Sequence, residues 1–310
     1  MEQLIRLFPV SMREAIRRSG IFEKQLEEIR VRVNAPLMFL TAEGELFLKG
    51  NILADKLDNQ CTYITSEDVR QMCMFMSKYS LYAYEEEIRK GFLTVEGGHR
   101  VGVCGQATCE AGFIRRMHPI SYLNIRIARE RKGCASGIFP CLMENDQFLN
   151  TLILSSPGVG KTTLLRDVIR LLSDGGENAK GRKVGLVDER SEIAGCLRGI
   201  PQNDVGIRTD VLDCCPKAEG MMLFIRSMAP EVLAVDEIGG AQDMEAMQYA
   251  MRCGCQIVAT IHSRDLEELM QKPGWKEYVR AKLFERYVVL SSTEGKRSYA
   301  VYSGELVQLC

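Results

Sequence analysis

The stretch Thr151-Leu-Ile-Leu-Ser-Ser-Pro-Gly-Val-Gly-Lys-Thr-Thr163 joins an apolar segment, a loop with two glycines and the start of a helical pattern. The apolar residues 151–154 predict a buried strand, and the pattern from Thr162 through Leu171 predicts a helix. A strand, a glycine loop and a helix that opens on Gly-Lys-Thr form the arrangement that holds the phosphates of a nucleotide. A chance glycine loop is the alternative, and the flanking strand and helix argue against it.

The residue types of this loop suit a phosphate group. Gly158 and Gly160 allow backbone N–H groups to curve around an anion, and the helix N-terminus adds unpaired donors. Lys161 would place a positive charge at the β- and γ-phosphates, and the hydroxyl of Thr162 could bind Mg²⁺. The first glycine of the strict motif is replaced by Ser155, which is small enough to keep the loop plausible. The predicted phosphate-binding residues are Ser156, Pro157, Gly158, Val159, Gly160, Lys161, Thr162 and Thr163.

Length and composition set the remaining bounds. The 310 residues predict two domains, and 46% hydrophobic residues are ample for full cores. A net charge of −1 gives no global basic field that would attract nucleic acid or anionic lipid. The first residues have no apolar segment typical of a secretory signal, so we expect a cytoplasmic protein whose twelve cysteines are reduced. No apolar run approaches the length of a membrane span.

Residues 1–140 predict an N-terminal α+β domain. The expected elements are short amphipathic helices over 4–20, three strands within 26–48, a helix after the N-cap Thr65, a hairpin over 92–103 with a turn at Gly97-Gly98, and a strand over 122–128.

Residues 141–310 predict an α/β domain, because strands and helices alternate as they do around a parallel sheet. We expect a RecA-like core that carries the phosphate-binding loop. The predicted strands are 151–155, 183–188, 232–236, 256–261 and 286–290, and the predicted helices are 162–173, 217–227, 241–253 and 264–272. The tail 286–309 predicts antiparallel strands, with turns at Glu294-Gly295 and Ser303-Gly304.

Two carboxylates follow the apolar strand Glu231-Val-Leu-Ala-Val-Asp-Glu237. An apolar strand that ends in Asp-Glu, placed after a phosphate-binding loop, is the pattern needed for phosphoryl chemistry. Asp236 would hold Mg²⁺ through a water molecule, and Glu237 would polarise the attacking water.

A second acidic segment, Val187-Asp-Glu-Arg-Ser-Glu192, also follows an apolar strand. Glu189 and Glu192 would lie at the carboxyl end of a parallel strand, where the sites of open α/β sheets gather. Glu189 is a second candidate for activating water. The alternative is a capped helix start, which Ser191 and Glu192 also suit.

His262 ends the strand Ile257-Val-Ala-Thr-Ile-His262 and could contact a γ-phosphate. A lone histidine is more often structural, but this one ends a strand in the order that the site requires. Arg208 opens the polar segment 208–217, which we expect to be a loop; Arg208 could reach the phosphate of a neighbouring subunit.

The order of these motifs resembles that of the secretion ATPase superfamily, which includes the traffic ATPases of type II and type IV secretion and of pilus systems. The acidic segment with Glu189 and Glu192 corresponds to the second acidic box of that superfamily, and Ala259-Thr-Ile-His262 corresponds to its His box. The resemblance implies ATP and Mg²⁺ as ligands. The chain departs from many members in having Asp-Glu at 236–237 where they have Gly-Glu.

A closer resemblance is to the stage III sporulation protein AA family of endospore-forming bacteria. It rests on Gly206–Gly220, Ile225–Pro230, Asp236–Gly240, Gly97–Gly102 and Leu123–Arg129. It implies an ATPase in the mother-cell cytoplasm, held at the membrane facing the forespore by a membrane-anchored companion protein. It also implies a homo-hexameric ring that powers or assembles a secretion-like channel. The alternatives are a nucleotide-gated scaffold without hydrolysis, and a nucleic-acid-dependent RecA-like ATPase; the near-neutral charge argues against nucleic acid.

Overall fold

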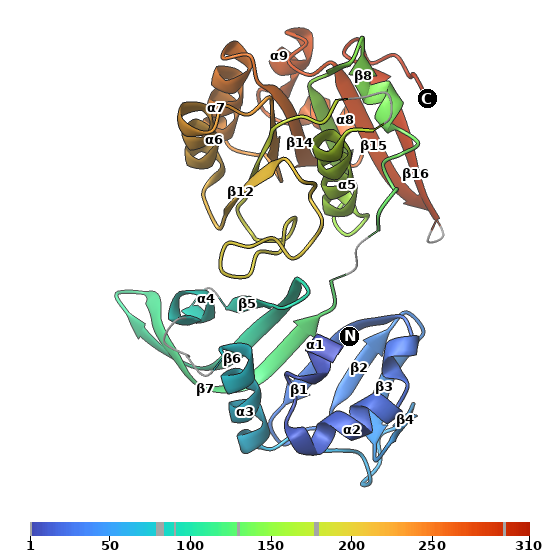
Figure 1. The fold of residues 1–310 in the computed structure, drawn as a ribbon, viewed down its shortest axis with the longest axis vertical. Helices are drawn as coiled ribbons and strands as arrows, with labels where there is room; N and C mark the ends of the chain where they lie inside the picture. Colours follow the sequence, from blue (N-terminus) through green and yellow to red (C-terminus); the bar gives the residue numbers. More distant parts are fainter. Residues whose placement is uncertain (1, 79–83, 90, 129–130, 177–179, 294–295) are drawn as a thin grey trace. The chain divides into compact units, whose positions relative to one another are not determined.

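The computed structural model describes residues 2–78, 84–89, 91–128, 131–176, 180–293 and 296–310 (Figure 1). The chain forms two compact units, Met1–Arg129 and Glu130–Cys310. Residues 131–140, which the sequence analysis placed in the first domain, therefore belong to the second unit. Ala135 and Ile138 are fully buried in a core cluster of that unit.

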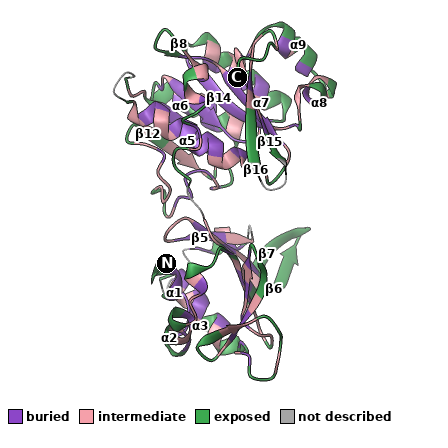
Figure 2. Cartoon of the chain, turned by 90° about the vertical axis from the view of Figure 1, so that its right-hand side faces the viewer, coloured by how far each residue is buried: buried purple, intermediate pink, exposed green. Residues whose placement is uncertain are grey.

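The first unit is built on an antiparallel sheet of order β4-β3-β2-β1-β7-β6-β5. Its strands are β1 (Leu26–Arg32), β2 (Met38–Thr41), β3 (Gly44–Lys49), β4 (Ile52–Ala54), β5 (Phe92–Val95), β6 (His99–Glu110) and β7 (Phe113–Arg126). The helices are α1 (Glu2–Ile5), α2 (Val10–Arg18), η1 (Ile21–Glu23), α3 (Ser66–Met76) and α4 (Glu85–Arg89). Figure 2 shows α1, α2 and α3 on one side of the curved sheet, where their buried faces join one apolar core.

Most of the predicted elements of this unit are confirmed. The meander is β1, β2 and β3, and the hairpin of β5 and β6 turns through Gly97 and Gly98, both at positive φ. Thr65 is the N-cap of α3, in a capping box with Asp68. The long pairing of β6 with β7 was not predicted, because most residues of its outer part are exposed and lack the apolar alternation of a core strand.

The second unit is a three-layer α/β fold. Its sheet has the order β12-β11-β13-β14-β10-β15-β16, parallel throughout except between β15 and β16. The strands are β10 (Thr151–Ser155), β11 (Val184–Asp188), β12 (Thr209–Asp213), β13 (Val232–Val235), β14 (Gln256–His262), β15 (Arg286–Thr293) and β16 (Lys296–Ser303). The helices are α5 (Lys161–Asp174), α6 (Lys217–Ser227), α7 (Ala241–Arg252), α8 (Leu266–Gln271) and α9 (Trp275–Arg280), and η3 (Phe139–Leu142), β8 (Met143–Glu144) and β9 (Gln147–Phe148) precede them.

Strand β10 shows why both faces of this sheet are covered. Ile153 packs into the apolar cluster that contains α5, whereas Leu152 and Leu154 pack into the cluster that contains α6 and α7. Successive side chains of a strand point to opposite faces, so a strand whose residues are all buried requires a helix on each side. The predicted parallel-rich core is therefore confirmed.

Two details differ from the sequence analysis. The segment Thr209–Asp213, predicted as loop, is the edge strand β12. It pairs with β11 only and is half-buried, so it tolerates the polar residues that hid it. Helix α9 was also not predicted. The turn predicted at Glu294-Gly295 lies outside the described residues. Within the part of the chain that the structure describes, no helix combines the length and apolar character needed to cross a membrane.

Candidate functional site

The phosphate-binding loop has the conformation that its glycines permit. β10 ends at the buried Ser155, and α5 begins at Lys161 after the N-cap Gly160. Gly158 and Gly160 have φ angles of 77° and 115°, in the region that favours glycine. Apart from its two chain neighbours, no described residue has an atom within 4 Å of the position that a Cβ of Gly158 would occupy. The backbone on that side is therefore open to an incoming anion.

The parallel sheet brings Asp236, Glu237 and His262 to the edge where the loop lies. Ser155 at the end of β10 is in register with His262 at the end of β14, and Val235 of β13 is in register with Ala259 of β14. Because parallel strands end at one edge, the residues after β13 lie beside the loop. β14 stands between the loop strand and the carboxylate strand, a neighbour relation that the chain order does not reveal.

His262 connects the loop lysine to a carboxylate. Lys161 Nζ lies 2.7 Å from His262 Nδ1, and His262 Nε2 lies 2.7 Å from Glu237 Oε1. Because an ammonium group only donates, Nδ1 accepts and the proton on Nε2 is directed to the carboxylate. Lys161 is buried, and burial lowers its pKa against the opposing charges of Asp236 and Glu237.

Arg190 holds the other oxygen of the same carboxylate. Its Nη1 lies 2.8 Å from Glu237 Oε2, so both carboxylate oxygens of Glu237 are engaged. The backbone of Glu237 has a φ of 49°, a conformation that is uncommon for a residue with a side chain, and its N–H donates to Thr260 Oγ1 at 2.8 Å. Arg190 is not among the residues predicted from sequence, although its place between Glu189 and Glu192 in the acidic segment was a usable signal.

Asp236 is the buried carboxylate next to this network. Burial raises its pKa, and the nearby charges of Glu237 and Glu192 act in the same direction. The hydroxyl of Thr260 donates to Asp236 Oδ1. The charge of Glu192 therefore acts on Asp236, and a catalytic role for Glu192 stays a prediction.

The donors at this edge fit Mg²⁺ better than a cation that needs a protein cage. Among the described residues there is no group of three or more His, Cys, Asp or Glu that could hold a metal ion. Mg²⁺ is commonly bound by one or two protein oxygens together with waters and substrate phosphates. The hydroxyl of Thr162 and the carboxylate of Asp236 suit that mode.

The acidic segment after β11 is a closed turn, and no helix begins in it. Asp188 accepts the backbone N–H groups of Glu192, Ile193 and Ala194 at 2.9 to 3.0 Å. Arg166 of α5 donates to the carbonyl oxygens of Ile193 and Glu192 at 2.6 and 2.7 Å. The alternative of a capped helix start is therefore wrong. The two hydrogen bonds from Arg166 hold the turn against α5.

Glu189 and Arg208 lie apart from the network of Lys161, His262, Glu237 and Arg190. Glu189 forms an ion pair with Lys217 at the start of α6. Arg208 Nη1 donates to the carbonyl oxygens of Ser173 and Asp174, 2.8 and 3.2 Å away, at the C-terminal end of α5. That end is about 20 Å from Lys161, given the rise of an α-helix. The action of Arg208 on a neighbouring subunit stays a prediction.

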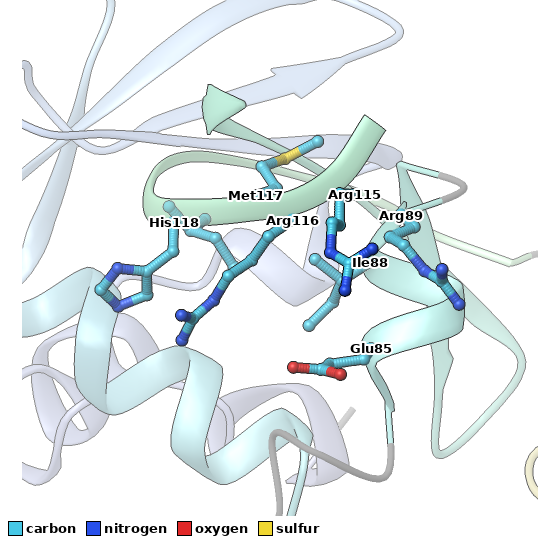
Figure 3. Close-up of a pocket in the computed structure, with 8 residues that line it drawn as sticks. Glu85, Ile88, Arg89, Arg115, Arg116, Met117 and His118 are labelled. Carbon is cyan, nitrogen blue, oxygen red and sulfur yellow. The ribbon is translucent and has the colours of Figure 1, made fainter. Parts of the chain in front are cut away.

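A separate pocket of about 260 Å³ lies in the first unit. Figure 3 shows the guanidinium groups of Arg89, Arg115 and Arg116 around it, together with the carboxylate of Glu85. Glu85 lines the pocket together with these arginines, and Arg115 also pairs with Glu110 at 2.5 Å, so the charge around the pocket is mixed. It contains no glycine loop, and none of the predicted phosphate-binding residues lines it.

The chain is similar to known proteins in sequence and in fold. A family model described as "Sporulation stage III, protein AA" matches residues 1–304. The stage III sporulation protein AA of Bacillus subtilis (strain 168) is 43% identical over 299 residues, covering 95% of this chain and 92% of that protein. Among solved structures, the Legionella pneumophila ATPase DotB has a TM-score of 0.58 at 15% identity, covering 96% of this chain and 81% of that chain. The pilus retraction motor PilT with bound ADP has a TM-score of 0.57 at 12% identity, covering 90% of this chain and 79% of that chain. Identities this low show a shared fold, which confirms the predicted fold class.

Proposed function

The chain belongs to the sporulation stage III protein AA family, and from this premise and the site geometry we propose that it hydrolyses ATP in a secretion-like channel complex of endospore formation. The observation that carries the proposal is the network at the end of the phosphate-binding loop. There a lysine, a histidine and a carboxylate are joined by two contacts of 2.7 Å.

The loop residues would bind the phosphates of the nucleotide. Backbone N–H groups between Ser156 and Thr163 would surround the α- and β-phosphates, and the ammonium group of Lys161 would turn from His262 to the β- and γ-phosphates. Thr162 and, through water, Asp236 would hold Mg²⁺, which when bound neutralises charge on the phosphate oxygens. The buried position of Lys161 makes its charge more effective, because water screens it less.

Glu237 would orient and polarise the attacking water. It follows β13, the strand next to β14, and His262 and Arg190 hold its carboxylate at two sides. Once Lys161 has turned away, His262 would take up a proton at Nδ1 and donate it to a γ-phosphate oxygen while Nε2 still donates to Glu237, so nucleotide binding would be coupled to the position of Glu237. Glu189 is the weaker candidate for this role, because it pairs with Lys217 and lies apart from the network of Lys161, His262 and Glu237.

The proposed setting follows from the family and the fold relatives. We propose a homo-hexameric ring in the mother-cell cytoplasm, held at the membrane facing the forespore by a membrane-anchored companion protein. ATP hydrolysis in the ring would drive assembly of the channel or transport through it. Support comes from DotB and PilT, which are described as an ATPase and a pilus retraction motor and share this fold.

The first test is ATP hydrolysis by the purified chain and by the Lys161→Ala variant, with molecular mass measured with and without ATP. We expect turnover that disappears in the variant and a mass that shifts toward a hexamer with ATP. A chain that binds ATP as a monomer without turnover, even with its companion protein, would contradict the proposal.

A nucleotide-gated scaffold is the second candidate, and two observations favour considering it. Ser155 replaces a glycine of the motif, and Glu237 is engaged at both of its oxygens. Such a scaffold would bind ATP and change its mass or partner affinity, and single-turnover measurements would detect no cleavage.

A further inference from the structure

The hairpin of β15 and β16 reaches past the end of the loop strand. Leu154 of β10 is in register with Val289 of β15, and β15 continues for four more residues, to Thr293. At about 3.3 Å per residue, Ser292 lies about 10 Å beyond that register position. Arg297 is paired with Ser292 on the returning strand. The backbone therefore brings this end of the hairpin, with Arg297, to the same edge of the sheet as the loop that follows Ser155.

The side chain of Arg297 lies directly against the loop. A Cβ added to Gly160 would be 2.9 Å from Arg297 Cζ, 3.0 Å from Nη1 and 3.2 Å from Nη2. The guanidinium group therefore lies against Gly160 at the position where any other residue would carry its side chain. No other residue type at position 160 would allow so close an approach.

The N–H donors of Arg297 are available for a ligand. Arg297 is exposed and forms no hydrogen bond or ion pair with any other described residue, although a guanidinium group has five N–H donors. An arginine left without a carboxylate at the entrance of a phosphate site is available for an anionic ligand.

Its position differs from that of Lys161. Lys161 Nζ is directed to His262, on the side of Glu237. The charge of Arg297 instead acts on the thiol of Cys134, which contacts the carbonyl oxygen of Thr163 at 3.7 Å. Arg297 thus lies on the flank of Gly160 and Thr163, where loops of this type surround the α- and β-phosphates, and away from the side of the γ-phosphate.

We propose that Arg297 is a nucleotide-binding residue that contacts the α-phosphate end of a nucleoside di- or triphosphate held by the loop of the same chain. This inference rests on the proposed nucleotide function. It adds a cation from the C-terminal hairpin, which lies outside every predicted motif.

The test measures equilibrium binding of ADP and of ATP to the full chain and to Arg297→Ala, Arg297→Lys and Lys161→Ala variants. Arg280→Ala, which removes an exposed guanidinium group from α9, is the matched control. We expect Arg297→Ala to weaken both nucleotides by the same factor, about tenfold, with partial recovery in Arg297→Lys. The Arg280→Ala chain should bind as the unaltered chain does, and thermal melting should show every variant folded.

Three outcomes would overturn the inference, and they are distinguishable. Unchanged binding in Arg297→Ala, with binding lost in Lys161→Ala, would reject Arg297 and leave the nucleotide function standing. A loss confined to ATP would move the contact to the γ-phosphate. A chain that binds neither nucleotide before any substitution would reject the inference together with the proposed function.

Discussion

At the scale of single residues, Glu237 is the side chain whose replacement should separate binding from hydrolysis. Glu237→Gln keeps the size and one acceptor oxygen but removes the negative charge that polarises water. We expect turnover to fall by about a hundredfold or more, with ATP affinity retained. Steady-state hydrolysis and equilibrium ATP binding check this. Glu189→Gln is the matched control and should have a smaller effect, because Lys217 engages Glu189.

The reverse order of these two effects would assign the water-activating role to Glu189. Full hydrolysis in Glu237→Gln would remove Glu237 from the chemistry.

Arg190 should act through Glu237 and not on ATP directly. Its Nη1 lies 2.8 Å from Glu237 Oε2 and holds that oxygen, whereas His262 contacts the other oxygen, Oε1. We expect Arg190→Ala to lower kcat by about tenfold with KM for ATP within about twofold, because a misdirected base orients water poorly. Arg190→Lys should recover part of the loss.

Kinetics over a range of ATP concentrations separate kcat from KM. A rise in kcat for Arg190→Ala would mean that Arg190 restrains Glu237 in a resting state, contrary to this prediction.

At the scale of elements, the turn after β11 should make stability depend on pH. Burial raises the pKa of Asp188 to about 6, against the lowering effect of three N–H donors. The folded chain therefore holds a proton that the unfolded chain releases at lower pH. The contribution of Asp188 to stability is highest below the unfolded pKa of about 4 and falls as pH rises to about 6, by about 3 kcal/mol.

Asp188→Asn removes the titrating group. The difference in the free energy of unfolding between the unaltered chain and this variant therefore measures the pH-dependent contribution of Asp188. Urea unfolding between pH 4 and pH 7 should show the unaltered chain losing stability relative to Asp188→Asn as pH rises. A constant difference across that range would contradict the raised pKa.

The contact of α6 with β11 depends on a glycine. A Cβ on Gly220 would lie 2.7 Å from Val187 Cγ1, inside the distance that two carbons allow. Gly220→Ala should therefore destabilise the second unit by about 1–3 kcal/mol through overpacking. Gly239→Ala is the control, because in the described part of the chain no atom beyond its two neighbours lies within 4 Å of the position of its Cβ. Equal unfolding midpoints for the two variants would show that α6 moves to accept the methyl group.

At the scale of the whole molecule, each unit has its own apolar core, and the single tryptophan reports on one of them. Trp275 is buried in the second unit and stacks on Phe284, with ring centroids 6.3 Å apart. ADP with Mg²⁺ should therefore raise the midpoint of the unfolding transition that tryptophan fluorescence reports. At a free ADP concentration of a hundred times Kd, the free energy of unfolding rises by about 2.7 kcal/mol.

Far-UV circular dichroism, which sees both units, should show a further transition that the nucleotide leaves unchanged. Equal shifts of all transitions would mean that the two units unfold together.

The sequence by itself determined the parts of this protein that are contiguous in the chain. The strand, glycine loop and helix at 151–174 and the carboxylates that follow β13 were predictable, because each depends on neighbours within a few residues. The parallel sheet followed from the alternation of strands and helices.

Only the tertiary structure decided which of these residues meet. Because β14 lies between β10 and β13, His262 contacts both Lys161 and Glu237. Glu189 instead forms an ion pair with Lys217. Arg190 contacts Glu237 from the turn after β11, and Arg297 lies against Gly160 from a distant hairpin that carries no predicted motif. Such contacts depend on strand order and register, which arise from the burial of the whole core and cannot be deduced from any one segment.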